Sequence, residues 1–200
     1  MISTAPQRRP PATALVEERA GGRLCSSSAS DLVVVYQRVS TVFDRRVLPE
    51  VYRLKMPLSP HRSAELDGVA IEAAKLSLPE LPGPLIIEGA GGLMVPLNRQ
   101  TRFVDVFQEW QLPVILCART ALGTINHTLL SVEALRTRSI PLLGIAFIGE
   151  EMADTQRTIA EMGKVRVLGR LPRVDPLTPE ALSAAMRAAF TAADFMETPQ

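Results

Sequence analysis

An acidic residue followed by a glycine-rich turn is the part of the sequence best suited to chemistry. Glu88 comes directly after the apolar run Pro84–Ile87 and precedes Gly89-Ala90-Gly91-Gly92. A carboxylate at the end of a buried strand can hold Mg²⁺, because this ion prefers oxygen ligands. Glycines lack a Cβ, so main-chain amides can approach phosphate oxygens and the turn can adopt positive φ. The spacing therefore indicates metal and phosphate chemistry at residues 88–92.

A second turn strengthens this interpretation. Leu122–His127 lies about 30 residues after the first turn, where it follows another apolar run and leads directly into a helical pattern. Thr124 is placed to cap that helix, while the free amides of the first turn and the helix dipole face an anion. Asn126 either contacts this anion or bonds locally to the main chain. Alone, residues 88–92 would also fit a simple glycine turn with a helix-capping glutamate, but the two turns together favour a ligand site.

The two histidines are predicted to be structural. His61 and His127 have no cysteine or second histidine nearby, so neither forms a metal-binding pattern. His61 is expected to hold the turn at Ser59-Pro60.

One expected motif is missing from the sequence. No G-x-x-x-x-G-K-[ST] loop occurs, and the only lysines are Lys55, Lys75 and Lys164, all outside glycine-rich surroundings. Phosphoryl transfer depends on positioning the phosphates and neutralising their charge, so activity is predicted to suffer. Because the sequence is patterned after Leu48 and unpatterned before it, a truncated or frame-shifted N-terminus is a hypothesis.

The elements that must position these residues alternate along the chain. Apolar runs rich in Val, Ile and Leu predict buried parallel strands at Leu85–Glu88, Val114–Ala118, Leu142–Ile148 and Val165–Gly169. Helical patterns fall between and after them, at Phe103–Trp110, Thr124–Thr137, Thr155–Met162 and from about Thr178 to Ala193. Thr178 and Pro179 are suited to begin the last helix. This alternation predicts an α/β fold with a doubly wound, mostly parallel sheet.

The first part of the chain differs from the rest. Residues 1–45 are polar and lack a clear period, so a divergent, poorly ordered segment is expected before a domain at residues 46–195. Leu32–Tyr36 fits either part of a helix or an edge strand.

Composition limits the classes of function. The 200 residues, of which 46% are hydrophobic, can fill one core. A net charge of +1 argues against a nucleic-acid partner. No apolar run approaches the roughly 20 residues of a membrane span, and Met1–Pro11 lacks the apolar region of a signal peptide. Cys25 and Cys117 lie far apart, so a soluble protein in the reducing cytoplasm is expected.

Residues 88–97 and 112–130 together closely resemble the dethiobiotin synthetase family, and the resemblance extends over about Leu48–Phe190. It implies a P-loop NTPase-like, three-layer α/β/α fold and a homodimer. It also implies ATP and Mg²⁺ as cofactors, with CO₂ and 7,8-diaminononanoate as the substrates from which the ureido ring of dethiobiotin is closed.

The same resemblance assigns roles to residues, although it assigns no catalytic residue. It implies that Glu88 binds Mg²⁺, and that the nucleotide is contacted by Glu88, Gly89, Ala90, Gly91, Pro172, Arg173 and Val174. The substrate would be contacted by Gly92, Thr124 and Asn126, with its carboxylate bound across the dimer interface. Asp31 is either a second metal ligand or a solvated residue at a helix start. Residues 172–174 also fit a proline turn that needs no ligand.

The sequence departs from the family in three places. Family members have the glycine-rich lysine loop, a later Lys-Pro pair, and an asparagine at a strand end that contacts adenine. Here Ile148-Gly149-Glu150-Glu151 stands at the position of that asparagine, so the resemblance does not carry the family's base selectivity over to this chain.

Two alternatives from other classes stay open. One is a non-catalytic subunit that keeps the dimerising half of the fold and binds a related chain or a small dicarboxylate. The other is a different P-loop relative, such as an amide-forming ligase of cobalamin synthesis or a partitioning ATPase of the MinD type. That relative explains residues 123–127 less well.

Overall fold

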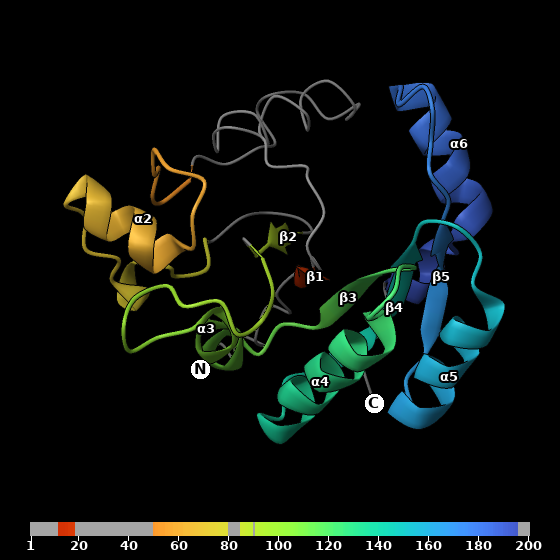
Figure 1. Ribbon diagram of the computed structural model, residues 1–200, viewed down its shortest axis with the longest axis horizontal. Coiled ribbons are helices and arrows are strands. Elements are labelled where there is room, and N and C mark those ends of the chain that lie inside the picture. The colour runs from red at the N-terminus through yellow and green to blue at the C-terminus, as the bar shows by residue number, and fades with distance from the viewer. Residues whose placement is uncertain (1–11, 19–49, 80–84, 90, 196–200) are drawn as a thin grey trace, which may run out of the picture.

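A parallel β-sheet organises the chain. The computed structural model describes residues 12–18, 50–79, 85–89 and 91–195. Its five-stranded sheet has the order β2-β1-β3-β4-β5, and every described pairing of neighbouring strands is parallel (Figure 1). The strands are β1 (Ala12–Glu18), β2 (Leu85–Glu88), β3 (Val114–Arg119), β4 (Leu142–Ile148) and β5 (Val167–Leu171).

Helices cover both faces of this sheet. They are α3 (Phe103–Trp110), α4 (Thr124–Thr137), α5 (Ala153–Gly163) and α6 (Pro179–Ala189), followed by the 3₁₀ turn η3 (Ala192–Phe195). Successive strand residues point to opposite faces, so β3 and β4 contribute to two cores. One core joins β3 and β4 to α3, α4 and α5 through Val104, Phe107, Leu116, Val132, Leu135, Phe147 and Ile159. The other joins Ile115, Leu143 and Leu168 to Phe190 and Phe195.

The predicted three-layer α/β/α architecture with a parallel sheet is therefore confirmed. Strands β2 and β4 and helices α3 and α4 have the predicted bounds. Strand β5 begins two residues later than predicted, because Lys164 ends α5 in the left-handed region and the Val165 amide still donates to Ala160 O at 3.2 Å. Helix α6 stops at Ala189, since Phe190 is extended and its ring packs into the second core.

Strand β1 was not among the predicted elements. It pairs with β2 along Ala12–Leu15 and with β3 along Ala14–Glu18, so it lies inside the sheet and not at its edge. Its formation depends on partners far away in the sequence, which a periodicity analysis does not detect. The proposed boundary at residue 45, and the two alternatives for Leu32–Tyr36, fall outside the described residues.

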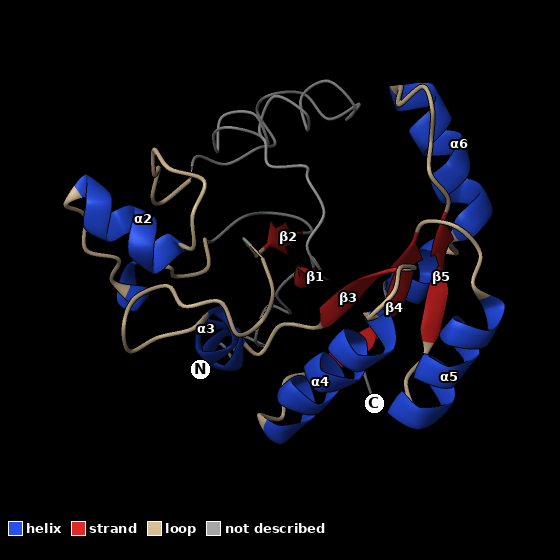
Figure 2. Cartoon of the chain, viewed as in Figure 1, coloured by secondary structure: helices blue, strands red, loops and turns tan. Residues whose placement is uncertain are grey.

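A satellite unit packs against the outer side of α3. It contains α2 (Pro60–Asp67) and the 3₁₀ turn η2 (Ala73–Lys75), and in Figure 2 α2 lies at the opposite end of the molecule from α5 and α6. Its small core consists of Ala64, Ile71, Leu97 and Val106. Trp110 Nε1 donates to Leu76 O at 2.9 Å, which fastens this unit to α3. No helix in the described ranges is both long and apolar enough to cross a membrane.

Candidate active site at the carboxyl ends of the strands

The residues singled out in the sequence gather at one edge of the sheet. In open parallel sheets, ligands bind outside the carboxyl ends of the strands. Glu88 ends β2, the Gly123 turn follows β3, and Pro172 follows β5. Residues predicted from separate parts of the sequence thus lie along the same edge of the sheet, the edge at which ligands of this fold class bind.

The strand ends are staggered. Leu15 of β1 is level with both Glu88 and Ile115, while β3 continues four residues further to Arg119. At about 3.3 Å per residue, the end of β2 stands about 13 Å short of the end of β3 along the strand direction. A ligand that touches both Glu88 and the turn after β3 must therefore be elongated.

The turn after Glu88 requires two of its glycines. A Cβ on Gly89 would lie 3.1 Å from Phe107 Cζ, a core side chain of α3. Gly91 has φ of +91°, and a Cβ there would lie 3.1 Å from Val95 Cγ2. Gly92 differs, because a Cβ there would meet nothing within 4 Å. The space beside Gly92 fits the close approach of a ligand, while Ala90 falls outside the described residues.

The chain beyond the turn is fastened to the start of α3. The Val104 amide donates to Leu93 O at 2.9 Å, and the Phe103 amide donates to Val95 O at 3.0 Å. The side chain of Asp105 accepts from the Arg102 amide at 2.8 Å, and the Arg102 guanidinium hydrogen-bonds the same carboxylate. This guanidinium lowers the pKa of Asp105. The glycine turn is therefore held between the end of β2 and a well-anchored helix start.

The turn before α4 corrects one prediction. Gly123, with φ of +92°, is the N-cap, and no side chain caps the helix. Thr124 is not the cap because the left-handed glycine starts the helix one residue earlier. The Thr124 hydroxyl instead lies 3.3 Å from Thr128 Oγ1, inside the protein.

The first turn of α4 leaves main-chain N–H donors available to a ligand. The Thr124 amide donates to Ala121 O and the His127 amide donates to Gly123 O, at 3.1 and 3.2 Å. Within the described part of the chain, the amides of Ile125 and Asn126 have no acceptor, as expected for a first helical turn. The exposed Asn126 side chain makes no local main-chain bond to a described residue. The arrangement can receive an anion such as a carboxylate.

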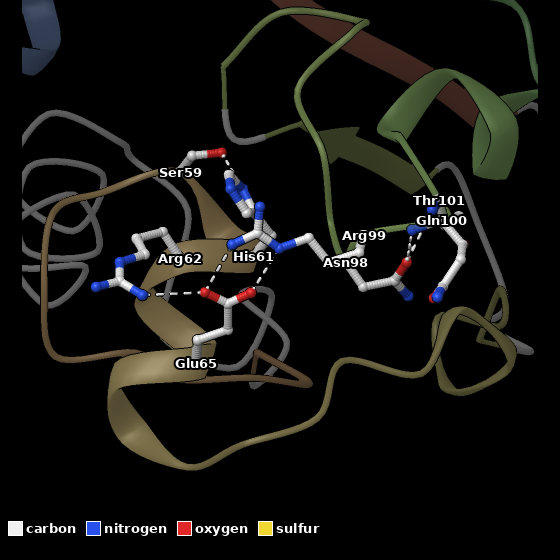
Figure 3. A network of polar contacts seen from close by, with 8 residues as sticks. All are labelled: Ser59, His61, Arg62, Glu65, Asn98, Arg99, Gln100 and Thr101. Carbon is white, nitrogen blue, oxygen red and sulfur yellow. Dashed lines mark hydrogen bonds and ion pairs between the residues drawn. The ribbon is translucent and has the colours of Figure 1, made fainter.

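His61 takes the predicted structural role. His61 Nδ1 lies 2.9 Å from Ser59 Oγ, and this contact holds the turn that begins α2 (Figure 3). His127 is exposed, and its ring lies against the Gly123 turn.

The surroundings of Glu88 suit a magnesium ion that is held mostly by water and phosphate better than a metal bound by protein side chains alone. No group of three or more His, Cys, Asp or Glu residues is close enough to bind a metal among the described residues. Mg²⁺ keeps several waters and commonly uses one or two carboxylates together with substrate phosphates. One exposed carboxylate at the end of β2 is compatible with that pattern. Asp31, the other predicted metal ligand, lies outside the described residues.

The segment after β5 leads into α6. Pro172 and Arg173 are exposed, and Val174 is half-buried. Thr178 caps α6 by accepting from the Ala181 amide at 3.2 Å, with Pro179 in the first turn as predicted. Residues 172–174 are available to a ligand, although a turn into α6 also accounts for them.

Sequence reasoning missed a set of contacts at the ends of β3, β4 and β5. Thr120, Gly149 and Arg170 connect these three strand ends. The available signal was a glycine directly after a strand, which marks a left-handed position or a close approach.

Comparisons with known proteins show the family to which the chain belongs. The family model for the AAA domain matches residues 25–181. An ATP-dependent dethiobiotin synthetase BioD from Rhodopseudomonas palustris (strain HaA2) is 57% identical over 162 residues, which is 81% of this chain and 76% of that protein. Proteins of the same name from Nitrobacter hamburgensis and Agrobacterium fabrum are each 58% identical, with the same coverage. A solved ParA family ATPase from Chlorobium tepidum aligns over 90% of this chain and 77% of its own at 13% identity, but the TM-score of 0.40 does not establish a shared fold.

Proposed function

Because the chain belongs to the ATP-dependent dethiobiotin synthetase family, we propose that it binds ATP and Mg²⁺ at the carboxyl ends of its strands and acts in biotin biosynthesis. Its substrates are CO₂ and 7,8-diaminononanoate. The observation that supports this best is the presence, at one edge of the sheet, of both the Glu88 turn and the uncapped turn before α4.

The two turns and the segment after β5 contact different parts of the ligands in this proposal. Glu88 and the main chain of Gly89–Gly91 contact the metal and phosphates, and Pro172–Val174 contact the base and ribose. The open surroundings of Gly92 admit the reacting group, while Thr124 and Asn126 belong to the turn that receives the substrate carboxylate. The stagger of about 13 Å between the strand ends suits an elongated diamino acid and nucleotide lying between the turns.

The chemistry balances as a ring closure. One amine adds to CO₂ to form a carbamate and releases a proton. The carbamate oxygen then takes the γ-phosphoryl group of ATP, which leaves ADP. The second amine attacks the carbamate carbon, releases a proton, expels phosphate and closes the ureido ring. When bound, Mg²⁺ would offset the charge that develops on the phosphates.

Two copies complete the site in this proposal. Leu122 is fully exposed in the turn before α4, and Leu130 on α4 is 55% exposed. Large apolar side chains beside an anion-binding turn suit contact with a second copy of the chain. We propose a homodimer joined around α4, in the cytoplasm.

The second candidate function is a non-catalytic binding subunit, and the missing G-x-x-x-x-G-K-[ST] motif favours it. Without a lysine over the phosphates, turnover is expected to be low. Incubation of the purified chain with ATP, Mg²⁺, bicarbonate and 7,8-diaminononanoate, followed by mass spectrometry for dethiobiotin, separates the two. Product that depends on all four components supports the ligase, whereas ligand binding without product supports the binding subunit.

A further inference from the structure

Asn98 lies at the tip of the loop that continues from the glycine turn. Its Oδ1 accepts from the Gln100 and Thr101 amides at 2.9 and 2.8 Å (Figure 3). Its Nδ2 donates to Ile71 O, in the satellite unit, at 2.9 Å. The amide side chain therefore closes the tip of the loop and joins that tip to the satellite unit.

The two arms of this loop pair with each other below Asn98. Pro96 and Arg102 form an antiparallel β-bridge, and the Phe103 amide donates to Val95 O at 3.0 Å. A short antiparallel pair is only marginally stable alone, and its turn sets how the two arms meet. Loss of the Asn98 side chain is therefore expected to loosen the pairing of the arms.

Val95 connects the loop to the glycine turn. Its amide donates to Gly92 O at 3.1 Å. A Cβ added to Gly91 would lie 3.1 Å from Val95 Cγ2, so this side chain packs directly against the turn. Glycine is conformationally permissive, and the conformation of the turn therefore depends on such neighbours. A shift of Val95 would change the direction in which the main-chain amides of the turn point.

The satellite unit holds the loop from its other side. Leu97 is buried in the small satellite core together with Ile71. The ion pair between Glu65 and Arg99 is exposed, so it is expected to contribute little. Asn98 differs from both, because its one side chain bonds the tip of the loop and the main chain of the satellite unit.

We propose that Asn98 is a positioning residue for the nucleotide. It holds Val95 against the glycine turn by joining the loop to the satellite unit, and the turn is thereby kept in the conformation that receives phosphate. The inference rests on the proposed function, because it assumes that the phosphates lie against the glycine turn. Residues that support a binding group commonly change affinity severalfold or more without contacting the ligand.

The test compares Asn98→Ala with Ser63→Ala in the full chain. Ser63 Oγ donates to Met56 O at 2.9 Å within the satellite unit, so Ser63→Ala removes a similar hydrogen bond away from the loop. Isothermal titration with a non-hydrolysable ATP analogue and Mg²⁺ is done well below both melting temperatures. We expect about fivefold to tenfold weaker binding by Asn98→Ala and unchanged affinity in Ser63→Ala.

Two results would overturn the inference and leave the proposed function standing. One is wild-type affinity in Asn98→Ala. The other is equal weakening in Asn98→Ala and Ser63→Ala, since affinity would then follow the stability of the satellite unit alone. Absence of binding by the wild type overturns the proposed function, and the inference with it.

A second variant covers the case in which Asn98→Ala does not fold. Asn98→Ser keeps an oxygen that can accept from the amides of the turn, but it lacks the donor to Ile71 O. Its affinity should lie between those of the wild type and Asn98→Ala. Wild-type affinity in Asn98→Ser would overturn the inference, because the bond to the satellite unit would then be dispensable.

Hydrogen exchange gives a readout that does not depend on the ligand. The Val95 amide should exchange faster in Asn98→Ala and Asn98→Ser than in the wild type, and Ser63→Ala should leave its rate unchanged. Unchanged protection of the Val95 amide in both Asn98 variants would refute a positioning role.

Discussion

Glu65 and Arg99, 34 residues apart in the sequence, form a two-bonded ion pair in which Arg99 Nε and Nη2 donate to the two carboxylate oxygens at 2.6 and 2.9 Å (Figure 3). Arg62 Nη1 donates to the same carboxylate at 3.1 Å. The pair joins α2 to the loop that precedes α3. That loop continues from the glycine turn after Glu88, so the satellite unit helps to hold one wall of the candidate site.

The stability of the protein should depend on pH through Glu65. The hydrogen bonds from Arg99 and Arg62 lower the pKa of Glu65 to about 2. A carboxyl group has a pKa of about 4.3 in an unfolded chain, so the lowered folded value stabilises the protein above that pH. This stabilisation is lost as pH falls from about 4.3 towards 2. Glu65→Gln should unfold at lower urea concentration than the wild type at pH 7, with a small effect because the pair is exposed.

The urea midpoints of both proteins, compared at several pH values, check this prediction. The difference between the urea midpoints of the wild type and Glu65→Gln should narrow as pH falls from about 4.3 towards 2. Glu161→Gln, which removes an exposed carboxylate from α5, serves as the control. A difference in urea midpoint that stays constant down to pH 3 would show that Glu65 does not contribute to the pH dependence of stability.

The glycine turn provides a matched pair of substitutions. Gly91→Ala forces a Cβ into a backbone with φ of +91° and against Val95, so it should destabilise the protein by about 1–2 kcal/mol and weaken ATP binding. Gly92→Ala meets nothing within 4 Å and should fold as the wild type does. Thermal unfolding and nucleotide titration measure both effects. Equal stability of the two variants would contradict the described turn.

Gly92→Ala also tests whether a bound ligand lies against Gly92. If the substrate or phosphate approaches Gly92 closely, this variant should keep its melting temperature and lose affinity. A variant with unchanged affinity would place the ligand elsewhere.

Thr178 anchors the start of α6. Thr178→Ala removes the hydroxyl that accepts from the Ala181 amide and should cost about 1 kcal/mol, or a fall of about 2–4 °C in Tm. Thr178→Ser keeps the hydroxyl and should recover most of the loss. If alanine and serine gave the same Tm, the cap would not contribute to stability.

The proposed dimer predicts a specific loss of association. Leu122→Asp places a charge on a fully exposed apolar side chain beside α4 and should convert dimer to monomer in sedimentation experiments. Met162→Asp alters a side chain that is 69% exposed near the end of α5, and it should leave the dimer intact. Dissociation by both variants, or by neither, would remove α4 from the interface.

Much of the fold could be predicted because its signals are local. The apolar runs that form β2 and β4, and the turn around Gly123, are defined by residues adjacent in sequence. The prediction that β2 is buried was wrong, because β2 lies at the edge of the described sheet and Ile86 is exposed. The Thr178-Pro179 start of α6 is equally local. Strand β1 could not be predicted in this way, since Ala12–Glu18 gain their structure from pairing with β2 and β3.

The presence of glycine turns at the candidate site could be predicted from the sequence, but the contacts that shape the site could not. The glycines after Glu88 indicated crowded or left-handed backbone, and a Cβ added at Gly89 or Gly91 would lie 3.1 Å from a neighbouring side chain. Thr124 was expected as a cap, yet the left-handed Gly123 took that position, because a glycine tolerates positive φ at little cost. The contact of Arg170 with Gly149 depends on strand register, which the sequence alone does not specify.

The central claim is that Glu88 supports a metal-dependent nucleotide site in this chain. Isothermal titration of the full chain with ATP, with and without Mg²⁺, tests it most directly when wild type is compared with Glu88→Gln and with the exposed control Glu133→Gln. We predict Mg²⁺-dependent binding that weakens at least about tenfold in Glu88→Gln and is unchanged in Glu133→Gln. No binding by the wild type, or equal affinity in Glu88→Gln, would contradict the account.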